Sequence, residues 1–158
     1  MTEQLSPLAL QALAVVKESG AIIGANHAHP HTIRHKGRID LVTETDIAVE
    51  AFLKERLATL APQAGFLAEE SAEDLSLPDT CWIIDPVDGT TNFAHGLPLT
   101  VTSVAYRLNG EIVLGIVNAP LLRECFIAEK GKGAWRNGER ISVSSVTACE
   151  NALIATGF

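Results

Sequence analysis

The sequence is poor in the features that mark secreted or membrane-anchored proteins. Its three cysteines, Cys81, Cys125 and Cys149, are odd in number, widely spaced and set among apolar residues, which predicts buried, reduced thiols rather than disulfides. No uninterrupted apolar run approaches the length of about 18 residues that a membrane span needs. Residues 1–10 hold no Lys or Arg, whereas a secretory signal begins with positive charge. We therefore expect a cytoplasmic protein that does not span a membrane.

Positive charge is also scarce. Twelve Lys and Arg residues stand against 19 Asp and Glu residues, a net charge of −7. This balance argues against nucleic-acid binding, because cationic side chains are needed to displace the counterions of phosphates. It does not exclude a phosphorylated ligand, since clustered carboxylates can hold divalent cations that reverse the local potential. The 158 residues, 47% of them hydrophobic, suit one globular domain.

Local signals predict two helices in the first part of the chain. Ser6 as N-cap and the following Pro indicate a helix over residues 8–23, weakened toward its end by two glycines. Thr43 and Asp46 form a capping box, and apolar residues at helical spacing continue a second helix to Leu60. The stretch between them, residues 26–38, has no apolar periodicity and is predicted to be a loop or mobile arm.

Beyond Pro62 the apolar residues no longer recur at helical spacing and instead follow the spacing that is typical of strands. Asn109-Gly110 and Asn137-Gly138 are strong signals for tight hairpin turns. The predicted strands cover residues 65–68, 81–85, 99–108, 111–118, 124–129, 133–136 and 141–143. Two helices followed by a meander predict an α+β fold in which the helices pack on a mostly antiparallel sheet.

The run from Trp82 to Phe93 carries the strongest chemical signal. Asp85 stands where a buried strand should end, and Pro86 removes a ladder donor. Gly89 permits an unusual backbone angle, and a short helix can begin directly after it, with outward N–H groups that suit an anion. Two carboxylates, those of Asp85 and Asp88, thus lie beside a phosphate cradle. Mg²⁺ prefers such hard oxygen ligands and is often shared with substrate phosphate. The alternative is a turn in which both carboxylates merely cap backbone N–H groups.

This run, Asp-Pro-Val-Asp-Gly-Thr-Thr-Asn-Phe, resembles the first signature of the inositol monophosphatase family of metal-dependent phosphatases. Two upstream elements match in the same order. Ala68-Glu69-Glu70-Ser71 resembles the family's Gly-Glu-Glu-Ser, with Ala in place of Gly, and residues 40–46 resemble its Asp-Leu-Val-Thr-x-x-Asp. Residues 131–134 match a later Gly-x-Gly-Ala. The similarity extends from about residue 36 to the end of the chain.

The resemblance implies a role for each matching residue. Glu69, Asp85 and the carbonyl of Val87 would hold a first Mg²⁺, and Asp85 and Asp88 would hold a second. Asp46 and Thr90 would form a hydrogen-bonded pair that orients the attacking water, with Glu69 also counted as catalytic. The backbone N–H groups of Gly89 and Thr90 would bind the substrate phosphate. Such two-metal sites make a nucleophile from water and stabilise the leaving oxygen.

Three assignments have rivals. Helix capping alone would explain the presence of Asp46. The two roles can coexist, because one carboxylate oxygen can accept a helix N–H while the other faces a metal-bound water. Of Glu69 and Glu70, only one should face the site if the strand continues, because neighbours point to opposite faces; the family pattern selects Glu69. The histidines at 27, 29, 31 and 35 suggest a zinc site, but no Cys or carboxylate accompanies them, and a solvated loop explains them adequately.

The resemblance also implies the activity and organisation of the protein. We expect a Mg²⁺-dependent phosphomonoesterase, inhibited by Li⁺ and homodimeric, acting on inositol monophosphate or a similar polyol phosphate. Fructose 1,6-bisphosphate, histidinol phosphate, a 3′-phosphoadenosine nucleotide, or a regulatory role with little catalysis are the alternatives. Residues 1–158 would be the N-terminal metal-binding domain, and 151–158 a strand leading to an absent second domain. The complete enzyme would hold two or three ions, and this chain alone is expected to turn over negligibly.

Overall fold

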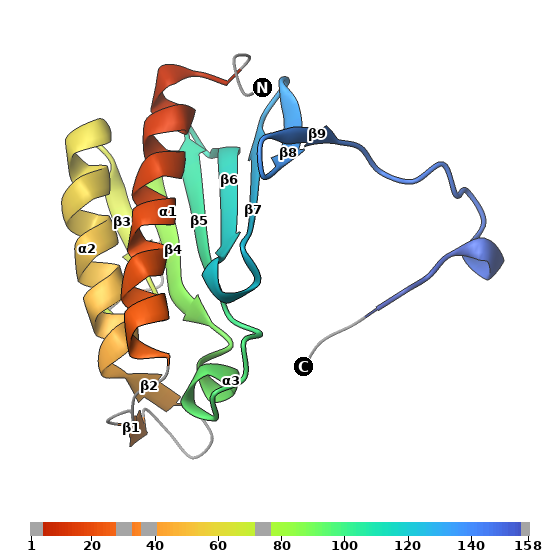
Figure 1. The fold of residues 1–158 in the computed structure, drawn as a ribbon. Coiled ribbons are helices and arrows are strands. Elements are labelled where there is room, and N and C mark those ends of the chain that lie inside the picture. Colours follow the sequence, from red (N-terminus) through yellow and green to blue (C-terminus); the bar gives the residue numbers. More distant parts are fainter. Residues whose placement is uncertain (1–4, 28–32, 36–40, 72–76, 156–158) are drawn as a thin grey trace.

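The computed structural model describes residues 5–27, 33–35, 41–71 and 77–155. Two long helices, α1 and α2, lie side by side on one face of a seven-stranded sheet, and the short helix α3 lies at one end of it (Figure 1). The helices are α1 (Pro7–Asn26), α2 (Glu44–Leu60) and α3 (Thr90–Ala94), with 3₁₀ turns at Pro120–Leu122 and Cys149–Asn151. The predicted α+β class is confirmed.

The main sheet is an open meander in the order β3-β4-β5-β6-β7-β8-β9. Its strands are β3 (Gly65–Ala68), β4 (Cys81–Asp88), β5 (Val101–Leu108), β6 (Glu111–Ala119), β7 (Glu124–Glu129), β8 (Gly133–Arg136) and β9 (Glu139–Ile141). Only β3 and β4 run parallel, and every other neighbouring pair is antiparallel. The parallel pair places the carboxyl ends of β3 and β4 side by side, because parallel strands end at the same edge of a sheet.

Helix α1 starts where the sequence predicts. The Ser6 hydroxyl accepts the backbone N–H of Ala9 at 3.2 Å, and the proline follows at the first helical position. The helix ends at Asn26, three residues later than predicted. By length and composition alone, α1 could cross a membrane, but Ala12 and Val16 are fully buried in the core. We interpret it as a core helix.

The two glycines of α1 have different surroundings, although the sequence suggested the same role for both. A Cβ on Gly20 would lie 2.8 Å from Asn118 Nδ2 and 2.9 Å from Pro120 Cβ, whereas a Cβ on Gly24 would meet nothing within 4 Å. Gly20 therefore lets the helix pack closely on the end of β6. Gly24 is exposed and has no such contact.

This difference predicts opposite effects of the same substitution. Gly20→Ala should lower the free energy of unfolding by about 1–3 kcal/mol, because it overpacks the contact between α1 and β6. Gly24→Ala should raise it by about 0.5–1 kcal/mol, because Ala is the better helix former. Urea denaturation of the two variants and the wild type would measure both values. Equal stabilisation by both substitutions would disprove the close contact.

Helix α2 begins with the predicted capping box. Asp46 Oδ2 accepts the backbone N–H of Thr43 at 3.0 Å, and the Thr43 hydroxyl oxygen accepts the N–H of Thr45 at 3.2 Å. Val49, Leu53 and Leu57 are fully buried. A helix with this cap and this apolar stripe packs against the sheet, and its first turn is held at the carboxyl ends of β3 and β4.

Three predictions of local structure need correction. The stretch predicted as a loop contains a short strand, β1 (Ile33–His35), which pairs antiparallel with β2 (Leu41–Thr43). Cys149 is exposed, unlike the buried Cys81 and Cys125, because it lies in the segment after β9 that leaves the sheet (Figure 1). Residues 152–155 form no strand, and Leu153 is fully exposed. Strand formation needs a neighbouring strand to pair with, and none of the described strands pairs with this segment.

The two faces of the sheet differ. One face packs on α1 and α2 through buried residues such as Trp82, Ile116 and Ile127. The opposite face carries a cross-strand row of Ala105, Gly115, Ala128, Ala134 and Ile141. Over β6 to β9 this second face has a hollow of about 240 Å³ with apolar lining. No described helix covers it.

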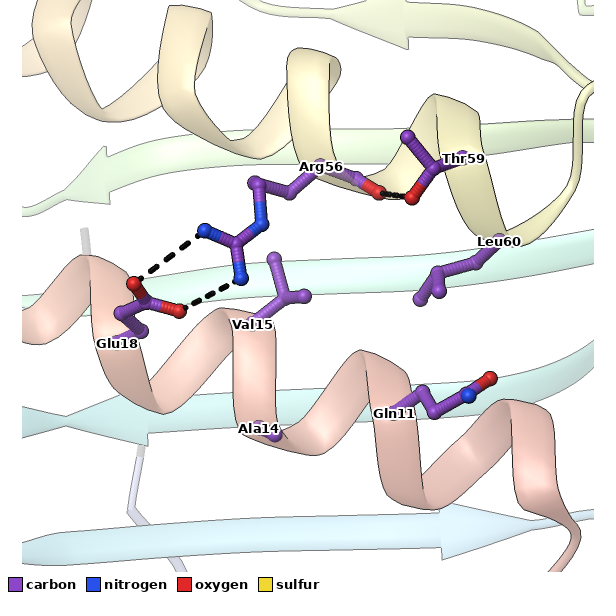
Figure 2. Close-up of a pocket in the computed structure, with 7 residues that line it drawn as sticks. All are labelled: Gln11, Ala14, Val15, Glu18, Arg56, Thr59 and Leu60. Carbon is purple, nitrogen blue, oxygen red and sulfur yellow. Dashed lines mark hydrogen bonds and ion pairs between the residues drawn. The ribbon is translucent and has the colours of Figure 1, made fainter.

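A groove of about 240 Å³ separates the outer surfaces of α1 and α2. Arg56 spans it with a two-pronged ion pair to Glu18, at 3.1 and 3.4 Å (Figure 2). Both side chains are about half exposed, at 46% and 52%, so the pair stabilises the fold by no more than about 1 kcal/mol. Arg56 lies ten residues after Asp46, about 15 Å along the helix. The groove is therefore separate from the candidate metal site at the start of α2.

Candidate metal centre

The hydrogen bond between Asp46 and Thr90 joins α2 to α3. Asp46 is 1% exposed, and its Oδ1 accepts the Thr90 hydroxyl at 3.0 Å. Its Oδ2 accepts the Thr43 backbone N–H and also the Thr43 hydroxyl. One carboxylate thus caps the helix and contacts Thr90 at the same time, and the two explanations of Asp46 coexist structurally. Its proposed catalytic role stays a prediction.

The Thr90 hydroxyl has two acceptors within reach. Thr90 Oγ1 lies 3.0 Å from Asp46 Oδ1 and 2.9 Å from the carbonyl oxygen of Val87. A hydroxyl has a single proton to donate, so only one of the two bonds can be made fully at a time. A cation on the Val87 carbonyl would therefore favour donation to Asp46.

Strand β4 is interrupted beside the candidate ligands, but it does not end at Asp85 as predicted. Asp85 is paired with Ser103 and Asp88 with Val101, and the register shifts between them. The extra residue forms a bulge that re-aims side chains. The Thr102 hydroxyl donates to the Pro86 carbonyl at 2.9 Å, so the carbonyl released from the regular ladder is satisfied. Pro86 itself lies within the bulge, where a residue without a backbone N–H is tolerated, so the strand continues through the proline.

The Asp85 carboxyl lies in an unfavourable environment for a negative charge. Burial, then the charge and hydrogen bond of Glu69, and then the charges of Asp88 and Asp46 raise the pKa of Asp85 to about 8. Its Oδ1 is buried and has no hydrogen-bond partner among the residues that the structure describes. A buried acceptor without a partner is costly, and a cation is a partner that would also cancel the repulsion between the carboxylates.

Glu69 approaches Asp85 from the neighbouring strand end. Its backbone N–H donates to the Ile84 carbonyl at 3.1 Å, which extends the parallel pairing one residue beyond β3. Its side chain lies close enough to Asp85 to raise the pKa of that carboxyl. Glu70 follows in a turn, and its backbone N–H donates to Glu50 Oε2 at 2.8 Å. Of the two adjacent glutamates, Glu69 is therefore the one in contact with Asp85.

Gly89 forms the start of α3. It has φ of 91°, a left-handed conformation that glycine adopts readily. A Cβ there would lie 2.7 Å from the Leu99 carbonyl oxygen, so the position also has no room for a side chain. Because this N-cap residue is glycine, it offers no side chain to the first N–H groups of α3. The proposed use of the Gly89 and Thr90 N–H groups for phosphate stays a prediction.

The donor set of this site suits Mg²⁺. The sequence singled out seven residues, and all of them gather at the ends of β3 and β4 and the starts of α2 and α3: Asp46, Glu69, Asp85, Val87, Asp88, Gly89 and Thr90. Within the described residues, no three acidic, His or Cys side chains are already arranged around one metal position. The site fits Mg²⁺ because its candidate ligands are oxygen atoms, and because Oδ1 of Asp85 lacks a hydrogen-bond partner among the described residues.

The zinc hypothesis gains no support from the part of the chain that is described. The His27 ring packs against Phe93 of α3, with ring centroids 5.8 Å apart, and its Nδ1 has no partner. His29 and His31 lie outside the described residues. Asn26, next to His27, donates to the Thr45 hydroxyl at 3.0 Å. The end of α1 thus supports the site by packing, a contact that no local sequence signal predicted.

Comparison with known proteins gives a consistent result. The profile described as the inositol monophosphatase family matches residues 4–158. An inositol monophosphatase of Dictyostelium discoideum is 46% identical over 92% of this chain and 55% of its own length. A fructose-1,6-bisphosphatase/inositol-1-monophosphatase of Thermotoga maritima is 44% identical over 75% of the chain and 45% of its own. Nus factor SuhB of Escherichia coli is 34% identical over 98% and 59%. The chain spans about half the length of these curated relatives.

Solved structures agree with the fold. An IMPase of Thermotoga maritima superposes with a TM-score of 0.78 at 39% identity, covering 84% of this chain and 52% of that one. An IMPase/NADP phosphatase complexed with Mg²⁺ and phosphate gives 0.72 at 28% identity, covering 80% and 49%. A staphylococcal inositol monophosphatase soaked in LiCl, described as an inhibitory complex, gives 0.76 at 26% identity, covering 85% and 52%.

Proposed function

Because the chain belongs to the inositol monophosphatase family, whose curated members include phosphatases, we propose that it serves Mg²⁺-dependent hydrolysis of a small phosphomonoester. One observation carries the proposal. The buried, unpartnered Oδ1 of Asp85 lies among acidic side chains, next to the hydrogen-bonded pair of Asp46 and Thr90. An acidic cluster with an open acceptor suits a cation, and the adjacent pair suits a water molecule.

In the proposed reaction, water attacks the phosphorus atom, the ester bond to the alcohol breaks, and the products are an alcohol and inorganic phosphate. Glu69, Asp85, Asp88 and the Val87 carbonyl would hold Mg²⁺. Mg²⁺ supplies two effects when bound, a lower pKa for water and neutralisation of phosphate charge. Asp46 Oδ1 accepts the hydrogen bond donated by the Thr90 hydroxyl, which leaves a Thr90 lone pair to accept a hydrogen bond from the attacking water. The N–H groups of Gly89 and Thr90 would orient the phosphate.

We propose inositol monophosphate or a similar polyol phosphate as the substrate, with two or three Mg²⁺ ions in the complete enzyme and inhibition by Li⁺. The names of the Dictyostelium relative and of the lithium complex support this choice. The double name of the Thermotoga relative keeps fructose 1,6-bisphosphate as an alternative. A regulatory role is the second candidate, because a relative is named as a Nus factor.

Phosphate release would distinguish these candidates. A colorimetric phosphate assay on the longest natural form of the chain, with Mg²⁺ and a panel of sugar, inositol and nucleotide phosphates, should show turnover on a polyol phosphate. Thr90→Val should lower the rate by about 10- to 100-fold, because outer contacts around a metal site typically have effects of this size. Thr90→Ser should keep most of the rate. No release from any member of the panel would favour the regulatory role.

Thr91→Val is the matched control for this assay. Thr91 is exposed and lies in the same short helix, so its substitution changes the same atoms without touching the Asp46 pair. We expect a rate within about twofold of the wild type, as is usual for surface substitutions away from special features. A Thr91 variant as slow as Thr90→Val would show that the helix, rather than the Thr90 hydroxyl, is responsible.

We also propose a cytoplasmic homodimer. The apolar hollow on the uncovered face of β6 to β9 supports association, since exposed apolar patches mark interaction sites. Multi-angle light scattering at high micromolar concentration tests the proposal, and a monomer mass would contradict it.

A further inference from the structure

Glu50 is a buried carboxylate with a specific partner. It lies in α2, and its side chain is 5% exposed, which is rare for glutamate unless it is paired. One of its oxygens, Oε2, accepts the backbone N–H of Glu70 at 2.8 Å. The other, Oε1, lies 4.0 Å from Lys54 Nζ. Glu50 lies outside the signature motifs of the sequence.

Glu50 belongs to a polar stripe on α2. Asp46, Glu50 and Lys54 follow one another at intervals of four residues and therefore share a helix face. Asp46 contacts Thr90, Glu50 contacts the Glu70 N–H, and Lys54 Nζ contacts the Ser71 hydroxyl at 2.8 Å. The stripe thus connects α2 to the start of α3 and to the segment that leaves β3.

These contacts bracket the candidate metal ligand Glu69. Its own N–H is bonded to the Ile84 carbonyl of β4, and the N–H of the next residue is bonded to Glu50. Holding both nitrogens restrains φ and ψ of Glu69, because these two dihedrals lie between them. The direction of the Cα–Cβ bond is then set as well. Glu69 lies in a turn just beyond the last residue of β3, so no further ladder bond along β3 does this.

We propose that Glu50 is a positioning residue that aims the Glu69 carboxylate at Asp85 and so prepares the site for Mg²⁺. The inference rests on the proposed function, since it gives Glu69 its role as a ligand. Glu50 itself acts through the backbone and contacts no ligand. Its charge strengthens the hydrogen bond, since charge-assisted bonds are shorter and stronger than neutral ones. The position of its oxygen is nevertheless the decisive property.

Two substitutions of Glu50 distinguish the effect of its oxygen position on Mg²⁺ binding from the effect of its charge. Glu50→Asp keeps the charge but withdraws the oxygen by one methylene, so it should weaken Mg²⁺ binding by about 10-fold or more. Glu50→Gln keeps an oxygen at the same reach and loses the charge, so it should retain Mg²⁺ affinity within about threefold. Glu55→Gln, on the exposed side of the same helix, is the control and should change nothing. Titration calorimetry with Mg²⁺ gives the three affinities.

Amide hydrogen exchange at Glu70 provides a readout that needs no metal. The Glu70 N–H should be protected in the wild type and Glu50→Gln, and should exchange faster in Glu50→Asp, while the amides of β5 and β6 stay protected in all three. Those core amides also report whether a variant folds. A merely structural role would lower protection throughout the sheet without a specific loss at Glu70.

The outcomes are distinct. Weak Mg²⁺ binding by Glu50→Asp together with near-normal binding by Glu50→Gln supports the inference. The reverse order would show that the Glu50 charge acts directly on the cation, and would overturn it. Unchanged Mg²⁺ affinity in Glu50→Asp, with Glu70 exchange accelerated, would overturn it as well. A wild-type chain that binds no Mg²⁺, yet shows the expected Glu70 protection, would instead refute the proposed metal site.

Discussion

Asp85→Asn is expected to abolish the stabilisation of the protein by Mg²⁺ while making the metal-free protein more stable. The substitution removes the charge of the proposed shared ligand without changing its volume. Mg²⁺ affinity should fall by more than about 100-fold, since loss of an outer-sphere partner alone lowers it about 10- to 100-fold. Calorimetry and thermal unfolding with and without Mg²⁺ would measure both effects.

The gain in metal-free stability follows from the pKa of Asp85. Burial and the neighbouring carboxylates raise this pKa to about 8, above the value of about 3.9 in an unfolded chain. Between these two values the folded protein binds more protons than the unfolded chain, so its stability falls as pH rises. Asparagine carries no such charge. At pH 8 the variant should be more stable by about 1–3 kcal/mol, a range reduced for solvent screening of a half-buried group.

Asp79→Asn is the matched control for this experiment. Asp79 precedes the same strand at its opposite end, and its side chain is 89% exposed. The same chemical change there should leave Mg²⁺ affinity unaltered and shift stability by less than about 0.5 kcal/mol. Wild-type Mg²⁺ affinity in Asp85→Asn would remove Asp85 from the metal site. A flat pH dependence of wild-type stability between pH 5 and 8 would contradict the raised pKa.

Gly89→Ala is expected to destabilise the protein by about 2–4 kcal/mol, more than a left-handed glycine alone explains. The φ of Gly89 is 91°, and a Cβ would lie 2.7 Å from the Leu99 carbonyl oxygen. That oxygen is held by Asn92 Nδ2 at 2.9 Å, so it does not move away freely. The connection between β4 and α3 would have to shift, and Thr90 with it.

Gly96→Ala separates the two contributions. Gly96 also has positive φ, 72°, but a Cβ there meets nothing within 4 Å. It should therefore show only the conformational cost of about 1–2 kcal/mol. Urea denaturation of both variants gives the difference. Equal losses of stability would mean that the space around Gly89 is not restricted.

Several site features were predictable because their causes lie within a few residues. The capping box joins Thr43 to Asp46, and the short helix α3 starts directly after Gly89. The grouping of Asp85 and Asp88 at a strand end follows from the apolar run before them. The link between Asp46 and Thr90, 44 residues apart, came only from the family resemblance. No local rule could join them.

The errors share one cause. The strand β4 was expected to end before Pro86, because proline lacks a ladder donor, but the register shift against β5 places Pro86 in a bulge where no ladder donor is needed. Cys149 was expected to be buried because apolar residues flank it, but its segment has left the sheet. In each case the outcome depends on a neighbour in space, or on its absence among the described residues, and not on adjacent sequence.

By itself the sequence determined the fold class, the starts of both long helices, the hairpin turns and the family, because capping, turn conformation, apolar period and signature motifs are local properties. Only the tertiary structure decided that Gly20 is a close-packing site while Gly24 is not, and that Glu50 reaches the backbone beyond Glu69. Both results depend on which strand lies against which helix face. Packing between distant segments sets that arrangement, and it gives chemically identical residues of one helix different roles.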